Sequence, residues 1–227
     1  MAEILTPTMV LAAGRAYHSR EEEQGDSVYM ESVVSTRDWS PARRVDHAVS
    51  FLRSWNALRS RGLTDTRAKR LIRGFIKDNR DDILSTRATQ LARLKQTDID
   101  KIGAMFDDAR ARGLGPTAVG KLLHFLMPDT VLLWDQKTIR SVLWLGPESK
   151  EFLRYQLFGK RLLAHLEGVG GPRSLQRMRA RHRVAAGGDE PLTKLVDELF
   201  YDESGMRERT ILALGGLGPA LASIFAP

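Results

Sequence analysis

The sequence predicts an all-α protein, and three observations support this fold class. Apolar residues recur every three or four positions along most of the chain, which is the spacing of one buried helix face. No segment shows the strict apolar–polar alternation of a half-buried strand. Proline and glycine stand where one helical pattern ends and the next begins. Because 227 residues provide an ample core, we expect a single helical unit over residues 1–227.

Capping residues place the predicted helices of the first half. Thr6-Pro7 pairs a residue suited to the N-cap with a proline suited to the first turn, and Ser40-Pro41 repeats this pattern. Thr64-Asp65 is a third helix start, and the acidic stretch 19–35 is expected to be a solvated connection. The predicted helices cover residues 6–18, 39–55, 64–77 and 85–96.

Two stretches of the chain carry dense positive charge. The first, on the helix that begins at Thr64-Asp65, is a stripe opposite the apolar side. It consists of Arg67, Arg70, Arg73 and Lys77. The second is the densest positive run of the chain, over residues 172–183, where apolar positions are few. It consists of Arg173, Arg177, Arg179, Arg181 and Arg183. Such stripes are most often solvated helix faces, but on a DNA-binding chain each is a candidate for phosphate contact.

The centre of the chain is organised around a glycine turn between two helices. A helix over 97–112 stops at Gly113-Leu114-Gly115, and Pro116 and Thr117 open the next helix, which runs to Leu126. A turn of this kind presents backbone N–H groups at a helix N-terminus, and that arrangement suits a phosphate group.

An apolar run follows the second helix of this hairpin and leads directly into an aspartate. The second helix breaks at Met127-Pro128-Asp129, and the apolar residues 131–134 come next. Asp135 then stands at the N-cap of a further predicted helix over 136–143.

These residues resemble the helix-hairpin-helix DNA glycosylases. In that family an apolar helix follows a Gly-apolar-Gly turn, and a short apolar run then ends in a catalytic aspartate. An apolar residue and an arginine come a few positions later. The residues that match this order are Gly113, Gly115, Asp135, Ile139 and Arg140. The resemblance covers about residues 97–143, with the hairpin at 97–126 and the catalytic segment at 130–143, and no flanking motif aligns.

The resemblance implies a helix-hairpin-helix DNA glycosylase-like fold and an enzyme that flips a base out of duplex DNA and hydrolyses its N-glycosidic bond. Asp135 would stabilise the oxocarbenium-like state and orient water. The hairpin would hold a DNA phosphate through Gly113, Gly115, Thr117 and Lys121. The residues that would shape the substrate pocket are Trp134, His124 and Arg140, although Trp134 and His124 also fit a core position.

One departure from the family pattern bears on strand cleavage. Bifunctional members carry a lysine two residues after the second glycine, where this chain has Thr117. We therefore expect a monofunctional glycosylase that leaves an abasic site, while Lys121 and Lys137 keep a lyase activity open. The base is either a damaged one or a modified base in foreign DNA, such as glucosylated cytosine in a phage genome. The second substrate would make the protein a defence enzyme.

The composition favours a polyanionic partner. The formal net charge is +7, from 35 basic and 28 acidic residues, which suits double-stranded DNA. Cysteine is absent, which excludes a thiol nucleophile and the four-cysteine iron–sulfur cluster of some glycosylases. The histidines lack paired zinc spacing, so we expect no metal and no cofactor. With no membrane-length apolar run and no signal-peptide pattern, we expect a cytoplasmic monomer without a membrane partner.

The last third of the chain continues the helical pattern. Further helices are predicted from Ser149 through Leu166 and from Pro191 onward, with shorter helical pieces to Pro227. Two other functions remain open. The chain is alternatively a non-catalytic helix-hairpin-helix DNA-binding module in which Asp135 is only a cap, or an interaction protein whose basic faces meet an acidic partner.

Overall fold

A computed structural model describes residues 6–18, 41–58, 63–134, 145–186 and 190–200, and this part of the chain is helical without a strand. The predicted all-α class is confirmed at this level. No helix among these residues combines the length and the apolar character needed to cross a membrane. The helices are α1 (Pro7–His18), α3 (Pro41–Ser54), α4 (Asp65–Asp78), α5 (Arg80–Arg87), the 3-10 turn η3 (Leu91–Arg93), α6 (Gln96–Ala111), α7 (Pro116–Leu126), α9 (Ser149–Gly170), α10 (Ser174–Ala186) and α11 (Leu192–Phe200).

One predicted helix differs from the structure. Residues 85–96 do not form one helix, because α5 ends at Arg87 and only the short turn η3 follows. Contacts with a distant loop explain the break. The N–H of Leu91 donates to the carbonyl of Asp129 at 3.0 Å, and the Thr130 hydroxyl donates to the carbonyl of Thr89 at 2.7 Å. These backbone groups therefore bond to the loop after α7 instead of continuing the helix.

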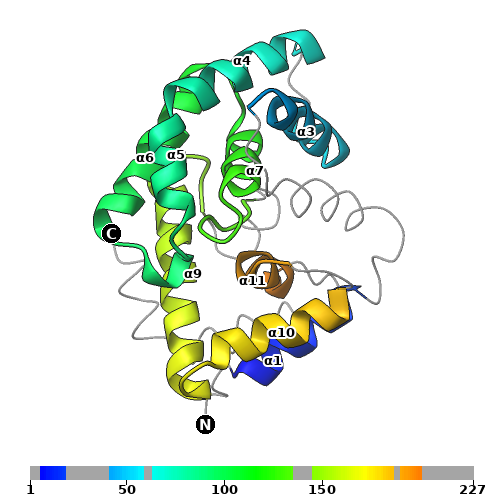
Figure 1. Ribbon diagram of the computed structural model, residues 1–227, viewed down its shortest axis with the longest axis vertical. Coiled ribbons are helices and arrows are strands. Elements are labelled where there is room, and N and C mark those ends of the chain that lie inside the picture. The colour runs from blue at the N-terminus through cyan, green and yellow to red at the C-terminus, as the bar shows by residue number, and fades with distance from the viewer. Residues whose placement is uncertain (1–5, 19–40, 59–62, 135–144, 187–189, 201–227) are drawn as a thin grey trace.

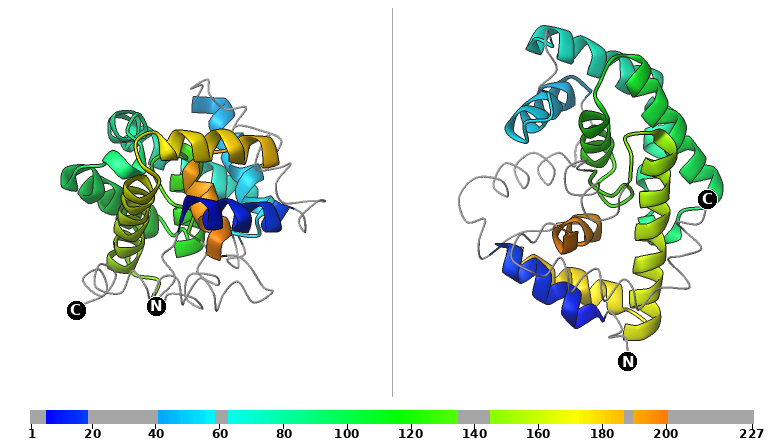
Figure 2. Two further views of the ribbon diagram at one scale, coloured as in Figure 1. Left: turned by 90° about the horizontal axis from the view of Figure 1, so that it is seen from below. Right: turned by 180° about the vertical axis from the view of Figure 1, so that it is seen from behind.

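The long helix α9 joins two groups of helices (Figure 1). On one side, α6 and η3 pack along α9, α7 packs against α6 and α3, and α4 packs against α3 and α5. On the other side, α10 and α1 contact α9 and each other, and Figure 2 shows them running alongside one another. The helix α11 contacts both α1 and α10 and lies inside the molecule (Figure 1).

A cluster of aromatic rings surrounds Trp134 in the core. Its ring lies 5.6 Å from the rings of Phe152 and Tyr155, in an edge-to-face arrangement with each. The ring of Phe152 also stacks on that of Phe106 at 4.3 Å, which joins α6 to α9. Aromatic pairs in these arrangements contribute about 0.5–1.5 kcal/mol each beyond the area they bury. The cluster therefore fixes the position of the chain just before Asp135.

Candidate DNA-binding site

The turn between α6 and α7 has the geometry that its sequence predicts. The N–H of Gly113 donates to the carbonyl of Arg110 at 2.9 Å, and that of Leu114 donates to the carbonyl of Ala109 at 3.3 Å. This pair of bonds is a Schellman motif, which requires a left-handed residue just past the helix. Gly113 supplies it, with φ of +98°, and the buried Leu114 anchors the turn to the core.

The N-terminus of α7 lacks a side-chain cap. Gly115 is the N-cap residue and Pro116 follows it, so neither residue offers a capping side chain. The N–H of Val119 bonds to the carbonyl of Gly115 at 2.9 Å, and the N–H groups of Thr117 and Ala118 precede this first helical bond. The positive end of the α7 dipole therefore lies at the turn, where a phosphate is favoured.

Gly115 does not need the conformational freedom of glycine. Its φ of −68° is open to any residue, and the left-handed position is Gly113 instead. A Cβ placed on Gly115 meets no atom within 4 Å. Its lack of a side chain therefore leaves open space beside the N–H groups of the turn.

The C-terminal half of α4 contacts Arg112, the residue at the end of α6 where the hairpin turn begins. The guanidinium of Arg112, at the end of α6, lies 2.8 Å from the carboxylate of Asp78 and 3.0 Å from that of Asp108. The Asn79 amide donates to Asp108 at 2.7 Å. Hydrogen bonds to Asp108 and then to Asp78 raise the pKa of Arg112, so this guanidinium stays charged. A Cβ on Gly74 would lie 3.0 Å from Arg112, which shows how closely α4 approaches the turn.

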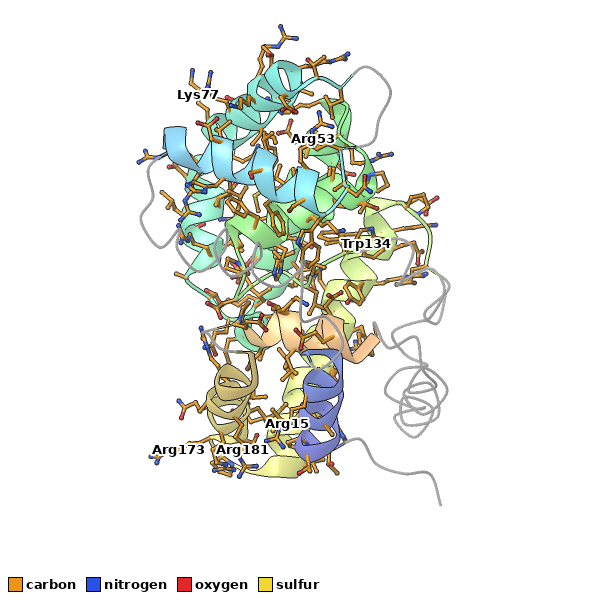
Figure 3. The ribbon with its side chains drawn as sticks, turned by 90° about the vertical axis from the view of Figure 1, so that its right-hand side faces the viewer. Arg15, Arg53, Lys77, Trp134, Arg173 and Arg181 are labelled. Atoms are coloured by element: carbon orange, nitrogen blue, oxygen red, sulfur yellow. The ribbon has the colours of Figure 1, made fainter. Side chains whose placement is uncertain are left out.

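The structure separates the two predicted basic faces. The α4 stripe is exposed along its length, and it belongs to the helix that contacts the hairpin. Its residues are Arg67, Arg70, Arg73 and Lys77. Arg177 and Arg181 are also exposed, but they lie on α10. Figure 3 shows Lys77 at one end of the molecule and Arg173 and Arg181 at the other. Of the two basic faces, the α4 stripe is on the helix that contacts Arg112 at the end of α6.

The apolar run after α7, residues 131–134, is neither helix nor strand, and its backbone bonds to side chains. The N–H of Leu132 donates to the side-chain oxygen of Gln156 at 2.7 Å, and the Gln156 amide donates back to the Leu132 carbonyl at 3.5 Å. His124 Nδ1 lies 2.7 Å from the Val131 carbonyl oxygen. Because buried backbone groups without partners are costly, these two side chains replace the neighbouring strand that the segment lacks.

Two glycines let helices approach this segment closely. A Cβ on Gly120 of α7 would lie 2.9 Å from Cγ of Trp134. A Cβ on Gly159 of α9 would lie 2.8 Å from Cγ of Leu132. Real Cβ atoms essentially never come so near, so the segment is held between two helices that only glycine allows to close on it.

Asp135 and Arg140 lie outside the described residues, as does Lys137. The structure places the chain up to Trp134, immediately before the predicted catalytic aspartate. The catalytic role of Asp135 and the pocket role of Arg140 therefore stay predictions. The described residues contain no group of three potential metal ligands close together.

Trp134 and His124 fill the core, since the solvent-exposed fraction of each side chain is 0%. Burial lowers the pKa of His124 to about 4, with smaller effects from the Val131 carbonyl and from the charges of Lys194 and Glu190. The imidazole is therefore neutral at pH 7. Since the Val131 carbonyl can only accept, the single ring proton is on Nδ1.

Lys121 points into the interior and not toward the turn. Its Nζ lies 3.4 Å from the backbone oxygen of Trp55 and 4.9 Å from the centre of that indole ring. A cation over an aromatic face is stabilised by the ring quadrupole. Lys121 thus holds α7 against the residue after α3, and its predicted contact with DNA has no support from this position.

Sequence reasoning missed a buried charged cluster on α11. Lys194 Nζ lies 3.1 Å from Glu198 and 3.8 Å from Asp197, and all three side chains are buried. Lys194 Nζ also lies 5.7 Å from the centre of the Trp55 ring, which is the ring that Lys121 contacts. The Thr193 hydroxyl donates to the carbonyl of Pro128. The spacing of Lys194, Asp197 and Glu198 at i, i+3 and i+4 was the available signal.

No family model, no curated protein and no solved structure matches this chain.

Proposed function

We propose that this protein binds duplex DNA through the α6–α7 hairpin and the α4 stripe, and that it excises a modified base by hydrolysis with Asp135. The observation that carries the proposal is the hairpin itself. An uncapped helix N-terminus and open space at Gly115 occur together, and the exposed basic helix α4 contacts Arg112 at the adjoining end of α6.

The DNA contact would divide into a positioning part and an electrostatic part. The N–H groups of Thr117 and Ala118 would bond to one phosphate, since they precede the first helical bond of α7. The α4 stripe would contact neighbouring phosphates and release their counterions. Contacts of this kind fix the register of the protein on the duplex without reading its sequence.

The catalytic part of the proposal rests on the order of residues after the hairpin. Asp135 directly follows a segment whose position is set by Gln156 and by the Trp134 ring cluster. A carboxylate there would stabilise the cationic sugar that forms as the bond to the base breaks. With Thr117 in the lysine position of bifunctional enzymes, the abasic strand would remain whole. The substrate would be a damaged base or a modified base of phage DNA.

One observation favours a second candidate function, a DNA-binding module without catalysis. Trp134 and His124, the two described residues expected to shape a substrate pocket, are fully buried. In that case Asp135 would only cap the helix that the sequence predicts over residues 136–143.

The hairpin is tested by Gly115→Val. The new side chain would occupy the open space beside Thr117 without straining the backbone, so we expect a folded protein with reduced affinity for a short duplex. Gly168→Val is the matched control, because a Cβ at Gly168 of α9 also meets no atom within 4 Å. Circular dichroism should show both variants folded. Wild-type affinity in Gly115→Val would remove the hairpin from the proposal.

The choice of basic face is tested by two double variants. Replacing Arg70 and Arg73 with Ala should weaken binding to all sequences alike and reduce the slope of affinity against salt by about two. Replacing Arg177 and Arg181 should leave the slope unchanged. The opposite pattern would place the DNA at the α10 end of the molecule.

Enzyme and binding module are separated by Asp135→Asn. Asn retains the capping oxygen but lacks the charge, so duplex affinity should stay near the wild-type value. Base release should fall on the order of a hundredfold or more. The assay is single-turnover excision on duplexes with oxidised, alkylated or glucosylated bases and on phage genomic DNA. Borohydride should trap no covalent adduct. If the wild type cuts none of these substrates, the binding module is the better description.

A further inference from the structure

A cavity of about 320 Å³ lies between α1 and α10, at the end of the molecule away from the hairpin. Both helices begin there. A Cβ on Gly170 would lie 2.6 Å from Ser174 Cβ and 2.9 Å from Pro7 Cγ, so the first residues of α10 and α1 meet beside this glycine. The positive ends of two helix dipoles therefore face the same region.

The polar side of the cavity is cationic. Arg177 and Arg181 line it from successive turns of α10, and Thr8 lines it from α1. Arg177 donates to the carbonyls of Gly170 at 2.9 Å and Pro172 at 3.1 Å, which holds its guanidinium at the cavity. A guanidinium carries five N–H donors, so these two bonds leave donors for a ligand.

No acidic residue is among the described residues that line the cavity. The nearby acidic groups of the described chain pair elsewhere. Glu167 of α9 lies 2.8 Å from Arg93, and Asp129 lies 3.1 Å from Arg179. None of these carboxylates therefore lies at the cavity to offset the charge of its two arginines.

The other side of the cavity is apolar. Leu11 and Met178 are buried at its base. Val169 also lines the cavity, and 47% of its surface is exposed. Methionine adapts its shape to a flat or irregular partner.

We propose that this cavity binds an organic phosphate of about the size of a nucleoside monophosphate. The arginine pair and the two helix starts would take the phosphate, and the wall of Val169, Leu11 and Met178 would contact the base or another apolar group. The volume lies at the lower end of the range for small-molecule sites, roughly 300–1,000 Å³. Guanidinium groups suit phosphate because they donate in a planar fork. The same chemistry also occurs at the 5′ end of a DNA strand.

The test is titration calorimetry on the full chain with adenosine monophosphate, inorganic phosphate and adenosine. We expect the monophosphate to bind more tightly than either of its parts. Arg181→Gln should lower its affinity by about tenfold or more, because a hydrogen bond to a charged group is lost. Val169→Ser should lower it without changing the binding of inorganic phosphate. Arg80→Gln, at an exposed position on α5, is the charge-matched control and should have no effect.

A short strand with a 5′-phosphate identifies the source of the ligand. If it competes with adenosine monophosphate and the same strand without phosphate does not, the cavity takes a DNA end; if neither competes, it takes a free nucleotide. The proposal is overturned if no probe binds at millimolar concentration. It is also overturned if Arg181→Gln binds the monophosphate as tightly as Arg80→Gln does. None of these outcomes depends on the DNA affinity of Gly115→Val or on base excision, so this proposal and the proposed function can fail separately.

Discussion

Acid should destabilise this protein through His124. This residue belongs to α7 and its imidazole lies in the protein core. Burial lowers the pKa of the imidazole from the ordinary value of 6.5 to about 4. Between these two values the unfolded chain binds a proton on His124 that the folded chain excludes. Stability therefore rises with pH in this window. The contribution of neutral His124 is fully present above pH 6.5 and is lost as the pH falls toward 4.

The size of the effect follows from the separation of the two pKa values. Over the whole window it is on the order of 3 kcal/mol, and between pH 7.5 and pH 5 it is about 2 kcal/mol. The range from pH 7.5 to pH 5 is the better one to measure, because most carboxylates remain ionised there. Since a domain of ordinary stability unfolds with about 5–15 kcal/mol, a change of this size is readily detected.

The assay is urea unfolding of the wild type and of His124→Leu at pH 7.5 and pH 5. We expect His124→Leu to be less stable at pH 7.5, because the Val131 carbonyl loses its hydrogen bond. It should nevertheless lose about 2 kcal/mol less than the wild type on acidification. His47→Gln, on α3, is the matched control and should keep the wild-type dependence. Equal losses in the wild type and in His124→Leu would refute the argument.

Three further changes probe the hairpin and the segment after it by urea unfolding at pH 7.5. Gly113→Ala should cost about 1–2 kcal/mol, because φ of +98° is unfavourable for alanine, and no loss would mean that the turn relaxes freely. Gly120→Ala should cost about 1–3 kcal/mol through its clash with Trp134, and a stability gain would contradict the close approach. Gln156→Leu should cost about 2–5 kcal/mol by leaving both backbone groups of Leu132 without partners, so a neutral result would show that water replaces the amide.

Local chemistry made the hairpin predictable from the sequence. A glycine past the end of α6 and a proline at the start of α7 depend only on near neighbours, so the turn was placed within a residue. The break between α5 and η3 was not predictable, because it depends on bonds from Leu91 and Thr89 to a loop that follows α7. Sequence periodicity carries no information about such distant partners.

The candidate site was predictable in part. The exposure of the α4 stripe followed from its period, but the burial of Lys121 did not, since it depends on Trp55. The same limit applies to α11. Its apolar residues indicated one buried face, whereas the interior position of the helix buries Lys194 and Glu198 as well. Charged residues are expected at the surface, and only their partners in the fold reverse that expectation.

The close contacts of Gly120 and Gly159 have a consequence for how this sequence can diverge. A larger residue at position 120 requires a smaller one at 134, because the added Cβ and the indole would occupy the same space. The same relation holds between positions 159 and 132. Substitutions at these pairs are therefore non-additive, and each pair should covary among relatives: a chain with alanine at 120 should carry a side chain smaller than tryptophan at 134.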